Sequence, residues 1–168
     1  AMFNWVTDNG FIANAKANDG YSTQNKSSKA NLRTNLDIDL TPSTKMTLNL
    51  LGTLAETNKP GDSADLWSMI YSLPATAFPV KTENGLWGGN TTWDGTKNPV
   101  AQSQAAAYTK GHNRSLYADM TLKQDLSSIL PGLGAGFMLA YDNWASYVEN
   151  HSKTYRYGSD NVQWKSGK

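Results

Sequence analysis

The sequence predicts an all-β fold built from long antiparallel hairpins, with one short helix inside a long irregular insertion. Residues 30–56 and residues 114–147 each contain two arms in which apolar and polar residues alternate, and a turn joins the arms. Each arm holds about ten alternating residues, whereas strands of soluble proteins usually hold about five or six. The greater length matches a tilted strand that crosses a bilayer.

The first hairpin, residues 30–56, has the clearest alternation. On its first arm the apolar side chains between Leu32 and Leu40 fall on one face. The other face of this arm carries polar residues, namely Arg33, Asn35, Asp37 and Asp39. The second arm repeats the pattern from Met46 to Leu54, and Pro42 supplies the fixed φ of a tight turn between the arms.

This alternation has two interpretations. An antiparallel sheet with one wet face alternates in this way, and so does the wall of a large transmembrane β-barrel whose polar residues face a water-filled lumen. In the barrel interpretation five charged residues face the lumen: Arg33, Asp37, Asp39, Asp119 and Lys123.

The composition excludes several classes of partner and site. The 168-residue chain has a net charge of +1 and no basic stripe, so no nucleic-acid partner is predicted. It has no cysteine, which excludes disulfide bridges and thiolate metal sites. The first residues do not have the pattern of a signal peptide, and no apolar run approaches the length of a membrane helix.

Polar segments flank the two hairpins, at residues 1–29 and 148–168. In the first segment, Phe3–Val6 and Phe11–Ala13 are expected to form short strands around a turn at Asn9–Gly10. A polar lead-in to the first hairpin follows them. In the last segment a loop is expected, followed by the start of a further strand around Val162–Trp164.

Residues 57–113 form the insertion between the hairpins. A helix is expected at about residues 63–72, where Leu66, Trp67, Ile70 and Tyr71 recur at helical spacing before Pro74. No regular element of length is expected between residues 75 and 110. Because an irregular insertion of this length is unusual in a compact domain, we expect it to touch a ligand.

The second hairpin, residues 114–147, repeats the plan of the first. Its apolar positions run from Leu116 to Leu122 and from Phe137 to Tyr141, around a turn at residues 125–134. Trp144 and Tyr147 near the end of the second arm are expected to be interfacial aromatic residues or amphipathic rim residues.

The two hairpins and a series of short sequence motifs between and after their arms resemble, in their order, the barrel region of the SusC/RagA-type TonB-dependent outer-membrane transporters of Bacteroidetes. The resemblance covers about residues 21–143 and begins with Asn31–Thr41 followed by Met46–Gly52. The later phrases are Leu73–Pro74, Phe78–Val80, Asn84–Gly89, Asn98–Ala101, Gln124–Leu126 and Leu130–Leu133.

The resemblance implies a large β-barrel with an internal plug that imports nutrients, commonly glycans and sometimes peptides, with energy supplied through TonB. It also implies a SusD-like surface lipoprotein partner, contact with outer-membrane lipid and no cofactor. The chain lacks counterparts of the family's N-terminal extension, TonB-contacting segment and plug. We therefore expect a fragment of the barrel, located in the bacterial outer membrane.

Such a fragment has two unpaired edges and an apolar face without cover. We expect the chain on its own to hide this face by bending its hairpins into a sandwich, by self-association or by folding the insertion across it.

No pattern predicts an enzyme. Asp37 and Asp39 share a strand face roughly 7 Å apart, within the range of glycosidase carboxylates, but two solvated charges have the same pattern. His112 and His151 have no partner at the spacing of metal ligands. Neither catalysis nor a metal site is therefore predicted.

The insertion offers better candidates for ligand binding, because flat aromatic rings stack on sugars and neighbouring polar groups bind hydroxyls. The rings belong to Trp67, Tyr71, Trp87 and Trp93, and the polar groups belong to Asn90, Asp94 and Asn98. In the alternative interpretation these rings form the core of the insertion, with Trp67 and Tyr71 on one buried helical face.

Two functions therefore stay open. The first is a barrel-wall fragment of a nutrient importer, whose loops contribute to recognition. The second is a soluble all-β carbohydrate-binding or adhesion module that binds a glycan independently.

Overall fold

The computed structural model describes residues 1–61, 63–89 and 98–158, and it is mostly antiparallel β-sheet with two short helices. The prediction of an all-β fold is confirmed. The chain divides into two compact units. Residues 1–8, 27–57 and 111–148 form one, which we call the sheet unit, and residues 9–26, 58–110 and 149–168 form the other, the insertion unit.

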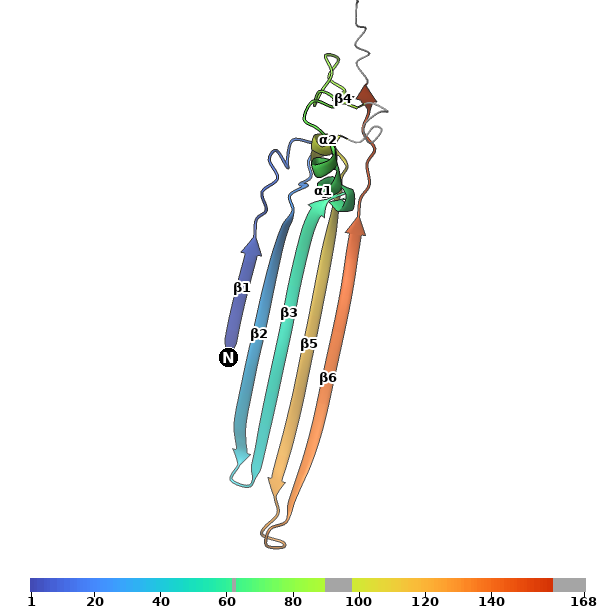
Figure 1. Ribbon diagram of the computed structural model, residues 1–168. Coiled ribbons are helices and arrows are strands. Elements are labelled where there is room, and N and C mark those ends of the chain that lie inside the picture. The colour runs from blue at the N-terminus through green and yellow to red at the C-terminus, as the bar shows by residue number, and fades with distance from the viewer. Residues whose placement is uncertain (62, 90–97, 159–168) are drawn as a thin grey trace, which may run out of the picture. The chain divides into compact units, whose positions relative to one another are not determined.

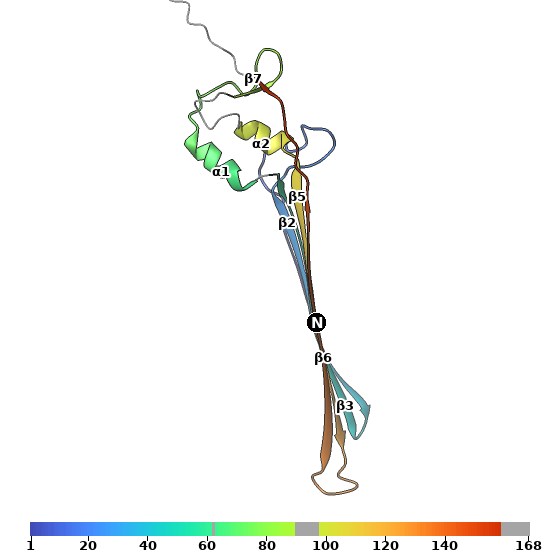
Figure 2. The ribbon, with the colours of Figure 1, turned by 90° about the vertical axis from the view of Figure 1, so that its right-hand side faces the viewer.

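Five antiparallel strands supply the sheet unit, in the spatial order β1-β2-β3-β5-β6 (Figure 1). They are β1 (Met2–Asp8), β2 (Lys26–Thr41), β3 (Thr44–Pro60), β5 (Tyr108–Asp125) and β6 (Gly134–Asn150). Because β3 pairs with β5, the two hairpins lie edge to edge in one layer, which Figure 2 shows from the side. They do not bend into a sandwich, which was one of the three expected ways of covering the apolar face.

The two faces of the sheet differ in polarity. Phe3 pairs with Leu32 and Trp5 pairs with Ala30, so these four side chains share a face. We call it the apolar face, and its other members are Leu36, Ile38, Leu40, Met46, Leu48, Leu50, Leu54, Leu116, Ala118, Met120, Leu122, Phe137, Leu139 and Tyr141.

The opposite face, called the polar face, is held by hydrogen bonds between strands. Thr47 donates to Asp37 at 2.8 Å, and Asn49, two residues further along β3, donates to Asp119 at 2.7 Å. Thr53 on the same face of β3 donates to Asn31 at 3.1 Å. These bonds link β2, β3 and β5 across one surface.

No apolar side chain of the sheet unit is fully buried. The buried hydrophobic residues of the described chain are Ala15, Leu66, Met69, Ala101, Ala106 and Ala107, and all six belong to the insertion unit. A sheet normally buries its apolar face against a second layer. In this unit the apolar face has no such layer.

The strands run further than the alternation predicts. β3 continues to Pro60, β5 begins at Tyr108 and β6 continues to Asn150. Near these ends both faces are polar, so the period-2 signal fades although the backbone stays extended. Polar side chains form hydrogen bonds between the strands there; for example, the Thr109 hydroxyl donates to the Asn150 side-chain oxygen at 2.7 Å.

The insertion unit contains two helices, α1 (Ser63–Ser72) and α2 (Pro99–Ala105), which pack against each other. The first lies where the sequence predicts it. A short parallel pair, β4 (Trp87–Gly88) with β7 (Tyr157–Gly158), completes the regular structure. Neither helix, over the residues that the structure describes, is long and apolar enough to cross a membrane.

Side-chain amides hold the insertion unit together. Asn98 is 1% exposed, and its amide nitrogen donates to the carbonyl oxygens of Val80 and Gly88 at 3.1 and 3.0 Å. Its oxygen accepts from the backbone nitrogens of Val100 and Ala101, which caps α2. The Asn58 amide similarly donates to two carbonyl oxygens, and Gln102 donates to Gly61.

Close backbone approach also shapes this unit. A Cβ atom on Gly88 would lie 1.7 Å from the Pro79 carbonyl oxygen, so only glycine fits at this position. The backbone nitrogen of Gly88 donates to the carbonyl oxygen of Val80, so the two residues whose carbonyl groups accept from Asn98 are also bonded to each other.

Two predictions for the chain outside the hairpins are wrong. Phe11–Ala13 form no strand, because the backbone nitrogen and oxygen of Ile12 bond the Gln24 side chain at 2.8 and 3.0 Å instead. Residues 75–110 contain α2 and β4, although no element of length was expected there. Asn98 followed by proline at the first helical position is the start signal of α2. The strand expected at Val162–Trp164 lies outside the described residues.

Replacing Asn98 by alanine is expected to destabilise α2 by about 3 kcal/mol, because the helix loses its cap and two buried carbonyl groups lose their donor. Amide hydrogen exchange in α2 measures the effect. Asn84→Ala, in an exposed turn of the same unit, should change exchange in α2 by less than about 0.5 kcal/mol. Equal protection in the two variants would contradict the role of Asn98.

Candidate functional site

The five charged residues that would face a lumen in the barrel interpretation lie on the polar face of the sheet unit. Asp37 and Asp119 accept hydrogen bonds from neighbouring positions of β3, and Asp39 forms an ion pair with Lys45 at 3.7 Å. Arg33 and Lys123 occupy the same face by the alternation of β2 and β5. Asp37 and Asp39 therefore engage different partners, Thr47 and Lys45.

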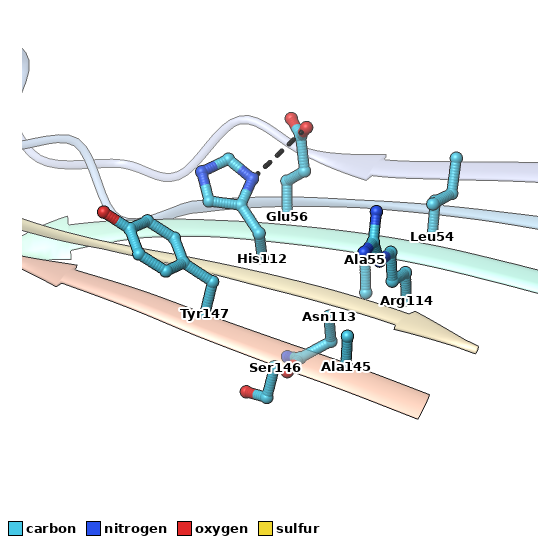
Figure 3. Close-up of a pocket in the computed structure, with 9 residues that line it drawn as sticks. All are labelled: Leu54, Ala55, Glu56, His112, Asn113, Arg114, Ala145, Ser146 and Tyr147. Carbon is cyan, nitrogen blue, oxygen red and sulfur yellow. Dashed lines mark ion pairs between the residues drawn. The ribbon is translucent and has the colours of Figure 1, made fainter. Parts of the chain in front are cut away.

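The apolar face changes character at a defined level of the sheet. Glu56, His112, Arg114 and Tyr147 gather there from β3, β5 and β6, and we call them the boundary cluster (Figure 3). His112 Nδ1 lies 3.5 Å from a carboxylate oxygen of Glu56, and its ring centroid lies 6.3 Å from that of Tyr147.

Apolar residues border the boundary cluster on one side. Arg114 also lines an apolar hollow with Phe3, Leu32, Leu54 and Leu116. Trp5 pairs with Ala30, which lines the same hollow, so an indole ring lies at this level of the sheet. The arrangement places aromatic and cationic side chains where an apolar surface meets a polar one.

The proposed core role of Trp67 and Tyr71 is wrong. Trp67 is 40% exposed and Tyr71 is 86% exposed, whereas Leu66 and Met69 are buried at 3% and 1%. Both pairs have helical spacing, and packing against α2 selects the one with flexible aliphatic side chains. Trp67 contacts Phe11 at a ring-centroid distance of 5.6 Å, whereas most of the Tyr71 side chain faces solvent.

Trp87 lies in β4, half-buried between two neighbours. The Lys81 ammonium is 4.8 Å from the Trp87 ring centroid, and Tyr155 meets the ring edge-on at 6.3 Å. Asn98, which was expected to bind hydroxyl groups of a ligand, uses its amide for the internal hydrogen bonds described above. Asn90, Trp93 and Asp94 lie outside the described residues.

An aromatic and cationic cluster in the insertion unit was missed by the sequence analysis. Tyr108 stacks on His151 at 4.6 Å and on Tyr21 at 5.6 Å, and Lys153 lies 6.0 Å from the Tyr21 ring. The three rings come from segments far apart in the sequence. No local pattern points to the cluster, because folding of the insertion unit brings these segments together.

An ion pair borders this cluster. The Lys153 ammonium donates a hydrogen bond to Asp19 Oδ2 at 2.6 Å. This bond, together with the positive charge of Lys153, lowers the pKa of Asp19 and raises the pKa of Lys153.

No group of three or more histidine, aspartate or glutamate side chains in the described ranges has the geometry of a metal site. Comparisons with protein-family models, with curated proteins and with solved structures found no match for this chain. The site is therefore interpreted from its own residues.

Asp19 is expected to titrate below the usual aspartate pKa of about 3.9. Because the folded pKa is the lower one, the stabilisation is present above the unfolded pKa and is lost as the pH falls through the folded value. The pKa of Lys153 is raised, so Lys153 keeps its charge and its contribution to stability until the pH rises through its folded pKa. Carbon-detected NMR titration of the Asp19 carboxyl measures the shift.

Lys153→Gln should return the Asp19 pKa toward its ordinary range, whereas Lys16→Gln, an exposed lysine of the same unit, should not. If Asp19 titrates identically in the protein with and without Lys153, the ion pair is not formed in solution.

Proposed function

We propose that this chain is part of the wall of an outer-membrane β-barrel that imports a nutrient, with the sheet unit in contact with lipid. The observation that carries the proposal is the apolar face, which the sheet unit itself does not cover with a second layer and none of whose side chains is fully buried. Acyl chains satisfy such a face, whereas water does not.

The dimensions of the apolar face support this proposal. On β5 the apolar positions lie between Arg114 and Gln124, ten residues apart. At about 3.3 Å per residue this span is about 33 Å along the strand, and a tilt of about 40° gives a height of about 25 Å. That height equals the apolar band of known outer-membrane barrels, about 25 Å.

The ends of the band also fit a bilayer. Thr44 donates to Gln124 at 2.6 Å at the turn end of the same face, which is the first polar contact beyond Leu122. At the other end, Trp5, Tyr147 and Arg114 lie where the face becomes polar. Tryptophan and tyrosine are enriched where a membrane protein meets the water interface.

The polar face fits a lumen, because its carboxylates at Asp37, Asp39 and Asp119 find partners within the sheet without a dry core. The sheet edges support a larger assembly. β1 pairs with β2 only along Ser27–Arg33, so the described residues supply no partner for the rest of that edge of β2. In a closed barrel, further strands pair with such edges.

The family likeness of the sequence leads us to place the protein among importers of the SusC/RagA type. In that role the intact protein works with TonB and with a SusD-like surface lipoprotein, and it imports an oligosaccharide or a peptide. The insertion unit, with Tyr71 exposed and with Trp87 and the Tyr108 cluster half-buried, contributes the recognition loops. The alternative of a soluble glycan-binding module is disfavoured, because a soluble module requires a cover for the apolar face.

Single-cysteine labelling tests the membrane contact, and the chain suits it because it has no cysteine of its own. An environment-sensitive fluorophore is placed at Leu36→Cys or at Asn35→Cys, adjacent residues on opposite faces. In phosphatidylcholine vesicles the label at position 36 should shift to the spectrum of an apolar environment, and the label at position 35 should keep its spectrum in water. Equal spectra at the two positions would overturn the proposal.

Charge substitution at the same pair gives an energetic prediction. Leu36→Arg places a charge near the middle of the apolar band and should destabilise the membrane-inserted form by about 2–4 kcal/mol. Asn35→Arg adds the same side chain to the polar face and should have a much smaller effect. Reversible denaturation in lipid vesicles measures both variants, and a larger loss for Asn35→Arg would contradict the assignment of the faces.

A further inference from the structure

We propose that the boundary cluster and the adjoining apolar hollow form a binding site for an anionic, phosphate-bearing lipid, with Arg114 as the headgroup ligand. This inference rests on the proposed function, because the site opens on the lipid-contacting face. It adds selectivity for a headgroup to a surface that otherwise contacts acyl chains.

The first argument is that the side chain of Arg114 lines two hollows of the sheet unit. The hollow of about 480 Å³ is lined by Phe3, Leu32, Leu54 and Leu116, and a second, of about 420 Å³, is lined by the boundary cluster. Arg114 lines both. An occupant that satisfies the pair has an apolar chain and, next to it, a negatively charged group.

The second argument concerns the charges within the boundary cluster. The carboxylate of Glu56 lies 3.5 Å from His112, which precedes Arg114 by two residues in β5 (Figure 3). Arg114 is exposed, and no carboxylate of the described residues lies within ion-pair distance of its guanidinium. The guanidinium can therefore bind a phosphate with two parallel hydrogen bonds.

The third argument is a polar group that lines the apolar hollow together with Arg114. Asn143 of β6 is this group, and its amide can donate to a phosphate or an ester oxygen. The acyl part then extends along the leucines toward the middle of the band. A free phosphate ion would leave the apolar hollow unfilled, so the geometry favours a lipid.

Native mass spectrometry of the full chain in dodecyl maltoside micelles tests this site. Dioleoyl phosphatidylglycerol and dioleoyl phosphatidylcholine are added in equal amounts, since they share acyl chains and differ in net charge. The chain should retain phosphatidylglycerol about fivefold more than phosphatidylcholine, the preference expected from one arginine near an anionic headgroup.

Arg114→Gln should abolish the preference, and Arg114→Lys should keep part of it because the charge remains. Lys29→Gln is the matched control, since it removes one positive charge from the polar face next to Ala30. The control should keep the fivefold preference. The same loss in the control would mean that net charge, and not Arg114, selects the lipid.

Three outcomes would overturn the inference: equal retention of the two lipids by the unsubstituted chain, an unchanged preference in Arg114→Gln, or displacement of phosphatidylglycerol by inorganic phosphate at the same concentration. Fluorophore labelling at positions 35 and 36 separates this failure from failure of the proposed function. Apolar spectra at position 36 without a headgroup preference would remove only the lipid site.

Discussion

The sheet unit depends on one constraint: an antiparallel sheet with an apolar face must cover that face with something other than water. Most folds supply a second layer of helices or strands. In this sheet Leu36, Leu54 and Leu139 all stay exposed, and no apolar side chain of the unit is fully buried. In the function that we propose, a bilayer covers the apolar face and supplies the free energy of hydrophobic burial.

The insertion unit is held together mainly by buried side-chain amides. Its buried apolar residues are few and small, apart from Leu66 and Met69. Buried amides of Asn58, Asn98 and Gln102 join its segments through backbone carbonyl groups. A core made this way is specific, because each amide requires a carbonyl in one place, and a lost partner costs more than an average hydrogen bond contributes.

The binding candidates illustrate what a local pattern leaves open. Trp67 and Tyr71 have the spacing of a buried helical face, yet Leu66 and Met69 occupy that face. Two sets of residues at i and i+3 or i+4 fit one helix equally well, and only the neighbour, α2, selects between them. The contacts among Tyr21, Tyr108 and His151 join segments more than forty residues apart in sequence.

Sequence alone determined the two hairpins, their turns and the division of Arg33, Asp37 and Asp119 from the leucines, because side chains on a strand alternate whatever the rest of the chain does. The helix at residues 63–72 follows from spacing in the same way. Tertiary structure decided that β3 pairs with β5 and that the Asn98 side chain forms its hydrogen bonds within the insertion unit. It also decided that Arg114 lies between an apolar and a polar hollow. Those outcomes depend on which distant segments meet, and no local periodicity encodes that choice.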